Sequence, residues 1–343
     1  MRIVISIVCC LLAVSAAGES PRVPTYPELV AMPAMARTAA LLDLREADDL
    51  ATLDALRFTA SGAAEARRTR GEAPLSPGCQ QPDEFDVESQ LRLARLAPNG
   101  ASFAEAMRRY MALTTRLDGK LATARATDEW RRQFPALKTW HREWQEARDS
   151  RVRELLRRTL GGQAIRSALA RARNPIANMP AAAPGSKRAI VRIGNELALA
   201  AYREYVFNLM CIDDESNLNW FKVQIAQIGW FGKREYGWAA DRAAVLFAQH
   251  ADADPDFQAQ IARALEPRLE TGDTDPENFA YLVDRVAVRA GRPQRFGTQV
   301  ECVDGRWIAP EIEARETLDE RRDRVNLVAY DIQVARMAGM CND

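Results

Sequence analysis

The sequence is poor in the residues that most often hold metals or phosphates. It contains only two histidines in 343 residues, and no cysteines stand at the spacing of a zinc site. It also has no glycine-rich phosphate loop, and no Gly-x-Ser-x-Gly turn such as carries the nucleophile of an α/β hydrolase. We therefore expect neither a metal nor a cofactor.

An excess of charge of one sign and long apolar runs are also missing. The chain has 47 Lys and Arg against 47 Asp and Glu, a formal net charge of +0. This balance provides no general attraction to nucleic acid or to anionic membranes. No stretch approaches the roughly 20 apolar residues that a spanning helix needs. We expect no nucleic-acid partner and no transmembrane segment.

The first 18 residues have the pattern of a secretory signal. Arg2 supplies a positive start, residues 3–14 form a short apolar core, and residues 15–18 are small. The sequence therefore predicts a signal peptide over residues 1–18 and export to the periplasm or the medium.

Removal of this signal would leave four cysteines: Cys79, Cys211, Cys302 and Cys341. An even number of cysteines in an oxidising compartment favours two disulfides, with three possible connectivities. Four separate buried thiols are the alternative.

The remaining sequence predicts a mainly α, multi-helical fold with two helical domains. Leucines recur at three- and four-residue spacing between residues 41 and 56, as on one face of a helix. Residues 174–187 carry three prolines and a glycine, which suits a linker. We expect an N-terminal domain over 19–173 and a C-terminal domain over 188–343, in keeping with roughly 150 residues per domain.

Helix ends and one hairpin can be predicted in the C-terminal half. Gly229, Gly272 and Gly291 follow apolar periodic segments, as C-terminal caps do. Expected helices cover 188–210, 216–228, 237–251, 255–271, 276–290 and 315–337. Asp304-Gly305 suits a tight turn, so a small β-hairpin is expected near 298–309.

Residues 138–173 form a basic amphipathic stretch. Within 127–173, twelve Lys or Arg stand against six Asp or Glu, a surplus of six. A solvated helix face whose arginine stems cover a core is the favoured interpretation. Weak contact with a membrane surface is the alternative. Gly161-Gly162 is expected to divide the stretch into two helices.

His250 is the candidate general acid or base because its side chain titrates near neutral pH. If the protein is an enzyme, Asp284 would orient His250 and Arg285 would stabilise developing negative charge. The alternatives are a histidine within a core or helix cap, and a structural ion pair for Arg285. Asp252, Asp254 and Asp256 lack the spacing of a calcium loop, and the sequence Asp254-Pro255 predicts a helix cap instead.

A run of amide and hydroxyl side chains follows in the sequence. Gln294, Thr298 and Gln299 stand around Gly297, which permits a tight turn. With Gln249 and Tyr281 these residues are the candidate ligand-binding groups. A turn that satisfies its own backbone is the alternative.

The segment 214–330 combines several short motifs. In chain order they are Asp214 with Asn217, Gly229-Trp230, Tyr236-Gly237, Gln249-His250, Phe257-Gln258, Ala280-Tyr281-Leu282 with Asp284-Arg285, Gly291, Gln294, Gly297-Thr298-Gln299, Asp319 with Arg321-Arg322, and Val325. The combination resembles an uncharacterised bacterial family, a domain of unknown function. The resemblance implies one compact helical domain with a shared polar site, and it implies no activity.

Three positions depart from the family pattern. Phe231 stands where the family has Pro, Phe296 where it has Tyr, and Asn326 where it has Gly. Loss of the tyrosine hydroxyl leaves packing as the expected role of position 296. Together these observations predict an exported cell-envelope protein with a binding or interaction domain, whose partner is an unknown envelope ligand or protein. A hydrolase or transferase that uses His250 is the alternative.

Overall fold

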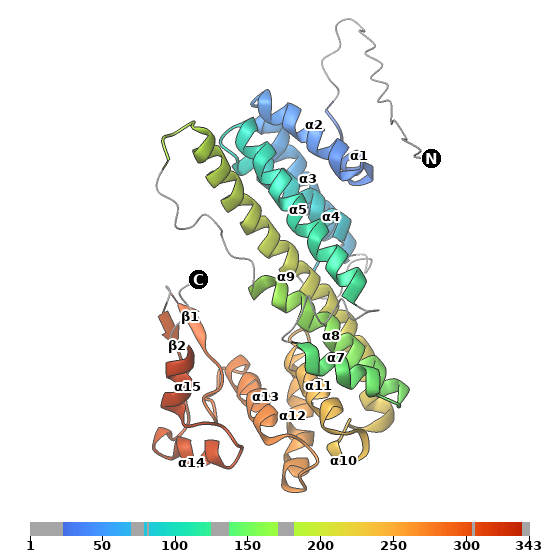
Figure 1. Cartoon of the computed structure of the whole chain (residues 1–343), viewed down its shortest axis with the longest axis vertical. Coiled ribbons are helices and arrows are strands. Elements are labelled where there is room, and N and C mark those ends of the chain that lie inside the picture. The colour runs from blue at the N-terminus through green and yellow to red at the C-terminus, as the bar shows by residue number, and fades with distance from the viewer. Residues whose placement is uncertain are drawn as a thin grey trace, which may run out of the picture.

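The computed structural model describes residues 23–69, 79–80, 82–124, 137–170, 182–303 and 306–337. These residues are mainly helical, which confirms the mainly α, multi-helical part of the predicted fold class (Figure 1). The predicted signal peptide, most of the linker and Cys341 lie outside them. None of the described helices combines the length and the apolar character that crossing a membrane requires.

The N-terminal helices pack around one buried cluster. They are α1 (Tyr26–Ala31), α2 (Ala34–Glu46), α3 (Leu50–Thr69), α4 (Pro82–Leu96) and α5 (Gly100–Ala124). The leucines at helical spacing lie inward, and Leu41, Leu53 and Leu91 are fully buried. We call this the N-terminal cluster; it also contains Tyr202 and Val206 from a later helix.

A second buried cluster, the C-terminal cluster, is rich in aromatic residues. It is formed by α7 (Lys138–Glu146), α8 (Ser150–Ala170), the end of α9 (Lys187–Ile228), α10 (Lys233–Tyr236), α11 (Trp238–Gln249), α12 (Pro255–Glu270) and α13 (Pro276–Arg289). Phe221 lies at its centre, stacked on Phe231 and edge-on to Phe247. Such ring pairs add stability beyond the area that they bury.

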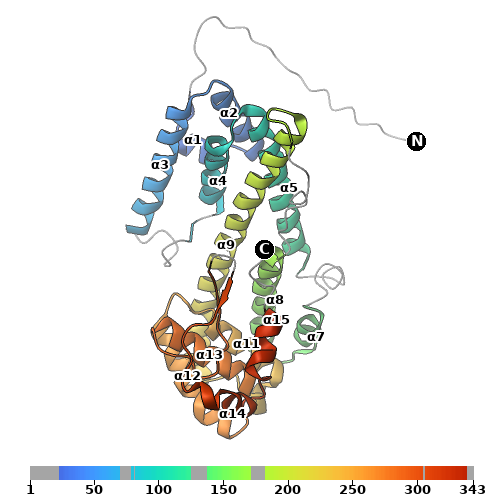
Figure 2. The ribbon, with the colours of Figure 1, turned by 90° about the vertical axis from the view of Figure 1, so that its left-hand side faces the viewer.

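Helix α9 is shared by both clusters. It runs unbroken over 42 residues, from the Ser186 cap to Gly229, and it passes along both halves of the molecule in two perpendicular views (Figures 1 and 2). The prediction of two helices, 188–210 and 216–228, is wrong, because residues 211–215 contain neither glycine nor proline. The boundary predicted at 174–187 does not separate the clusters, since α7 and α8 precede it and contribute to the C-terminal cluster.

Helix α8 is likewise continuous through Gly161-Gly162, so the predicted break is wrong. The glycines permit close approach to α9. A Cβ atom on Gly162 would lie 2.8 Å from a carboxylate oxygen of Asp213. The break lies instead before Ser150, where Asp149 accepts hydrogen bonds from the amides of Arg151 and Val152.

The predicted caps in the C-terminal half are confirmed. Asp254 accepts from the amide of Phe257 at 3.0 Å, and Asp275 caps α13 in the same way. Gly229, Gly272 and Gly291 follow α9, α12 and α13 with positive φ.

The C-terminal segment differs from the expected single helix over 315–337. It consists of η2 (Arg315–Thr317), α14 (Leu318–Asp323) and α15 (Tyr330–Met337). Asn326 has a φ of 60°, which an α-helix does not allow. Before this segment, β1 (Glu301–Val303) and β2 (Arg306–Ile308) pair antiparallel, with Cys302 opposite Trp307. The expected turn at 304–305 lies outside the described residues.

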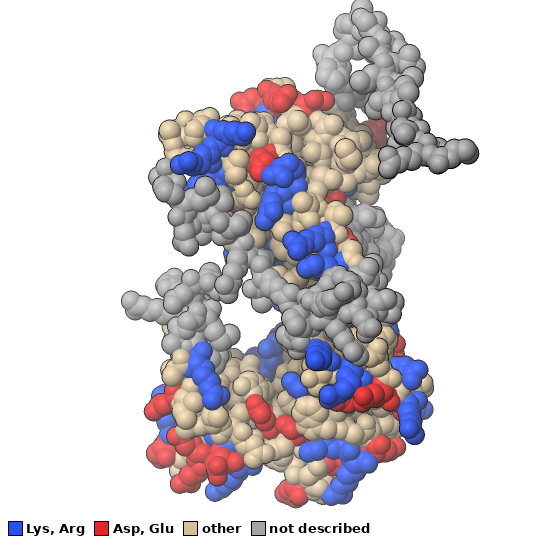
Figure 3. All heavy atoms as spheres, in the orientation of Figure 1, with Lys and Arg blue, Asp and Glu red and all other residues tan. Residues whose placement is uncertain are grey.

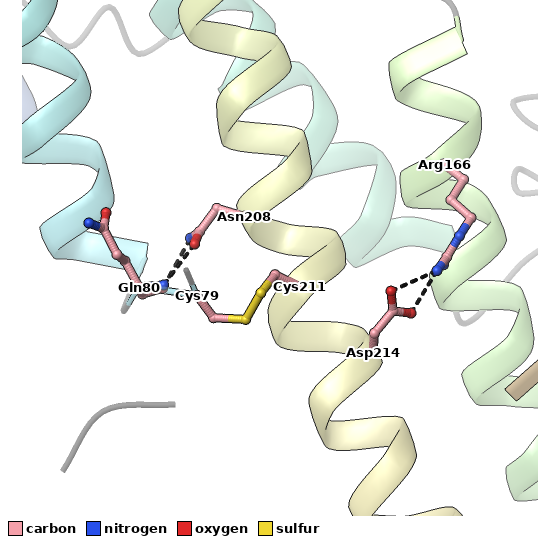
Figure 4. The surroundings of a disulfide bond; sticks show 6 residues. All are labelled: Cys79, Gln80, Arg166, Asn208, Cys211 and Asp214. Carbon is pink, nitrogen blue, oxygen red and sulfur yellow. Dashed lines mark hydrogen bonds and ion pairs between the residues drawn. A yellow bond between two sulfur atoms is a disulfide. The ribbon is translucent and has the colours of Figure 1, made fainter. Parts of the chain in front are cut away.

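One disulfide links the first helices to α9. Cys79 bonds to Cys211 with a Cα–Cα distance of 5.5 Å, an ordinary value for a disulfide. Beside it, Gln80 and Asn208 exchange two hydrogen bonds of 2.8 and 3.0 Å (Figure 4). Of the two predicted disulfides, this bond gives the pairing of Cys79 and Cys211.

Candidate functional site

Asp284, the predicted partner of His250, forms its hydrogen bonds with the turn at 295–298 instead. It is fully buried, and its carboxylate accepts from the amides of Arg295, Phe296 and Thr298 at 2.7, 2.9 and 2.8 Å. The Thr298 hydroxyl adds a fourth bond of 2.9 Å. Burial raises the pKa of Asp284, and these hydrogen bonds oppose the rise. Asp284 therefore organises the turn at 295–298, and its predicted role as orienter of His250 is wrong.

The side-chain amides of Gln294 and Gln299 form hydrogen bonds with backbone groups in and beside the same turn. Gln294 is fully buried, and its Oε1 accepts from the amide of Gln299 at 2.7 Å, while its Nε2 donates to the Gln299 carbonyl at 3.1 Å. The Gln299 side chain donates to the carbonyl of Tyr281. Gly297 has a φ of 64°, and a Cβ there would lie 3.0 Å from the ring of Tyr330. Gln294, Thr298 and Gln299 thus form hydrogen bonds within their own turn, which was the alternative to a ligand-binding role.

Arg285 forms a structural ion pair, as one of the two interpretations predicted. Its Nε lies 3.1 Å from Oδ1 of Asp252, and Arg289 lies at the same distance from that oxygen. Burial disfavours the charged form of Asp252, but the hydrogen bond and charge of Arg285 still lower its pKa. Gln249 donates a weak bond to the Asn278 carbonyl.

His250 lies in a narrow opening between α8, α9 and α11. The opening is also lined by Arg158, Thr159, Gly162, Gln163, Arg166, Asp214, Asn217, Leu246 and Phe247. Its free volume is about 10 Å³, which is room for one water molecule. Burial, followed by the charges of Arg166 and Arg285, lowers the pKa of His250 to about 3. The imidazole is therefore neutral at pH 7 and a poor base.

The arginines of this opening were missed by the sequence analysis. Arg166 binds both oxygens of Asp214, at 2.7 and 2.8 Å, from the face of α9 opposite the disulfide (Figure 4). Burial raises the pKa of Asp214, and Arg166 opposes this shift. The two residues are 48 positions apart, so no local pattern connects them. The only local signal is the glycine pair one turn before Arg166.

A larger groove lies between α12 and α13, with a volume of about 300 Å³. We call it the α12–α13 groove. It is lined by Ala259, Ala262, Arg263, Glu266, Phe279, Val283, Val286, Ala287, Arg292, Pro293, Arg295 and Glu313. Its floor is apolar, with Phe279, Ala262 and Ala287 buried beneath it. Its rim is charged.

Three arginines stand on the rim of this groove. Arg295 pairs with Glu266 at 3.0 Å. Arg263 and Arg292 are exposed, and neither guanidinium has a carboxylate partner within the described ranges. The guanidinium groups of Arg263 and Arg292 therefore lie above an apolar floor and can bind an anion. Arginine was not predicted at this site, because Arg263 and Arg292 belong to no motif.

The basic stretch 138–173 places its apolar side in the C-terminal cluster. Trp140, Val152 and Leu155 are buried there, and Arg242 lies over the ring of Trp140 at 4.8 Å. Positive and negative side chains alternate over the lower face in Figure 3. The favoured interpretation, a helix face that covers a core, accounts for Trp140, Val152 and Leu155.

The fold and these sites define a mainly helical protein whose C-terminal half is built around α9, α11 and the capped turn at 295–298. Residues 186–338 match the model of DUF6624, a family of unknown function, which confirms the resemblance seen in the sequence. The match begins at the Ser186 cap of α9 and excludes α1 to α8. No curated protein and no solved structure matches the chain.

Proposed function

We propose that this is an exported protein of the cell envelope that binds an amphipathic anion in the α12–α13 groove. The ligand would carry a carboxylate or phosphate on an apolar chain or ring. The observation that carries the proposal is the pair Arg263 and Arg292, which lie above an apolar floor and have no carboxylate partner among the described residues.

The chemistry of the groove favours such a ligand on two grounds. Guanidinium groups bind carboxylates and phosphates through paired hydrogen bonds. The floor, with Phe279 and Val283, gains about 25 cal/mol for each Å² of apolar surface that a ligand covers. A volume of about 300 Å³ is at the lower end of small-molecule sites.

Binding is better supported than the alternative of a hydrolase or transferase. Of the three residues proposed for catalysis, Asp284 holds a turn and Arg285 pairs with Asp252. His250 is left without a carboxylate hydrogen-bond partner among the described residues, beside a space for a single water molecule.

Calorimetric titration with decanoate, and with decanol as the neutral control, tests the proposal. We expect saturable binding of decanoate, about tenfold weaker in Arg263→Gln and in Arg292→Gln, the loss of about 1.4 kcal/mol. Arg324→Gln, an exposed arginine outside the groove, is the matched control and should bind as the wild type does. Equal affinity for decanoate and decanol, or equal losses in all three variants, would overturn the proposal.

Export is supported by the signal-like residues 1–18 and by the Cys79–Cys211 disulfide, since disulfides persist in oxidising compartments. Cell fractionation with intact-mass measurement tests it. We expect a periplasmic or secreted chain shortened by about 18 residues. A full-length chain in the cytoplasm with free thiols at both positions would contradict export.

A further inference from the structure

We propose that the open cavity lined by α2, α4, α5 and α9 binds an organic ammonium group, such as one end of an aliphatic diamine. The cavity has a volume of about 270 Å³. Its lining comprises Ala34, Asp86, Gln90, Met111, Thr114, Thr115, Asp118 and Tyr205. It lies in the N-terminal half, outside residues 186–338 except for Tyr205, and none of its residues belongs to a predicted site.

One lining residue, Gln90, carries an unused hydrogen-bond acceptor within the wall of the cavity. Gln90 is fully buried, and its Nε2 donates to Oδ2 of Asp86 at 3.0 Å. Its Oε1 is buried without a hydrogen-bond partner in the described part of the chain. A buried acceptor left in this state costs about 1–3 kcal/mol, which a donor on a ligand would recover.

The negative charge of Asp86 is balanced by an ion pair with Arg37. Arg37 of α2 is buried and donates to Oδ2 of Asp86 at 2.8 Å. Arg37 does not itself line the cavity. This pair therefore adds no net charge to the site.

The mouth of the cavity carries an unbalanced carboxylate. Asp118 is exposed and accepts a hydrogen bond of 2.8 Å from the hydroxyl of Tyr205. Within the described ranges it has no Lys or Arg partner at ion-pair distance. The charges of Asp86, Asp118 and Arg37 thus sum to −1.

These groups match a primary ammonium. It has three hydrogen-bond donors and a single positive charge, whereas the cavity offers Gln90 Oε1, the Asp118 carboxylate and hydroxyl oxygens as acceptors. Ala34 and Met111 provide apolar wall for an alkyl chain. No group of three His, Cys, Asp or Glu side chains suited to a metal ion occurs in the described part of the chain, so an organic cation fits better.

Calorimetric titration of the full chain with 1,4-diaminobutane tests the proposal, with 1,4-butanediol as a neutral probe of similar size. We expect saturable binding of the diamine and none of the diol. Asp118→Asn should weaken diamine binding about tenfold, because it removes the unbalanced charge at the mouth. Asp43→Asn, on an exposed face of α2 outside the cavity, should leave binding unchanged.

A second variant tests whether weaker binding comes from the charge at the mouth rather than from a change in the fold. Thr115→Lys places a competing cation at the exposed mouth without touching a buried group, and it should also weaken binding. Circular dichroism checks that each variant is folded. Absence of saturable diamine binding, equal binding of the diol, or equal affinity of Asp118→Asn and Asp43→Asn would overturn the proposal.

Discussion

At the scale of single residues, the motifs shared with the family hold the C-terminal segment together. Asp284 binds the turn at 295–298, and the fully buried Arg322 donates to the carbonyls of Phe296 and Val328. Asp319 accepts from the amide of Tyr330. These residues add side-chain hydrogen bonds to the turn at 295–298 and to the connection between α14 and α15.

Asp284→Asn should lower the free energy of unfolding by about 1–3 kcal/mol. The amide keeps one acceptor oxygen but directs its NH₂ toward backbone N–H groups that previously had an acceptor. Denaturant unfolding measures the loss. Asp323→Asn, at an exposed position of α14, should change stability by less than about 0.5 kcal/mol. Equal effects of the two substitutions would contradict the structural role.

His250 makes stability depend on pH. Its pKa is about 3 in the folded protein, below its usual 6.5, so the unfolded chain binds the proton more tightly. Stability is therefore lost as the pH falls from about 6.5 toward 3. His250→Gln should reduce this slope by up to about 1.4 kcal/mol per pH unit. Urea unfolding at pH 6.5, 5.5 and 4.5 measures it.

The control for His250→Gln is the pH dependence of its free energy of unfolding above pH 7.5, compared with that of the wild type. There the imidazole is neutral in both states, so the two proteins should show parallel stability curves. A slope between pH 6.5 and 4.5 that is the same with and without the histidine would contradict the lowered pKa of His250.

At this scale the sequence predicts helix caps, which depend on neighbouring residues, but not hydrogen bonds between residues far apart in the chain. The caps at Asp254 and Asp275 follow from neighbouring residues. The packing role of Phe296, which is buried, was expected from the loss of the tyrosine hydroxyl. The positive φ of Asn326 also fits its place where the family has glycine, because asparagine tolerates that conformation. The partner of Asp284 could not be predicted, since it depends on how α13 meets a turn eleven residues later.

At the scale of helices, the disulfide and the α8–α9 contact fix α9 from two sides. Cys79–Cys211 ties it to the start of α4, and Arg166 of α8 binds Asp214 one turn further along (Figure 4). Periodicity predicted α11 to α13 to within a few residues. It failed at 211–215 and at Gly161-Gly162, where contacts between helices decide continuity.

Replacing both cysteines, Cys79→Ser with Cys211→Ser, should lower the free energy of unfolding by about 4 kcal/mol. The bond closes a loop with a sequence separation of 132 residues, and its loss enlarges the unfolded ensemble. Guanidinium unfolding of the double variant measures the change, and thiol titration of the wild type checks that the bond is present. An unchanged midpoint would contradict the contribution assigned to the bond.

At the scale of the whole molecule, the two buried clusters do not follow one another in chain order, because each takes residues from both sides of the 174–187 segment. Leu156 of α8 belongs to the C-terminal cluster, whereas Tyr202 of the later α9 belongs to the N-terminal one. The linker composition of 174–187 suggested a boundary, but composition does not show which helices share a core. The division into two helical domains stays a prediction.

A chain that begins at residue 182 should therefore not fold cooperatively, although it contains the whole family match. It lacks α7 and α8, which supply Trp140, Val152 and Leu155 to the C-terminal cluster. A chain that begins at residue 137 restores them and should regain a cooperative thermal transition. Circular dichroism compares the two chains. A cooperative transition in the shorter chain, at the midpoint of the longer one, would support the boundary at 174–187.

The continuity of α9 imposes a constraint on helical phase. Successive residues of an α-helix are rotated by about 100°. Deletion of one residue between the Tyr202 and Asp214 positions would turn every later side chain by that angle relative to the N-terminal cluster. Phe221 and Asp214 would then leave their partners while Tyr202 kept its own. Length changes in this stretch of α9 are tolerable only in steps near seven residues, which almost restore the original phase.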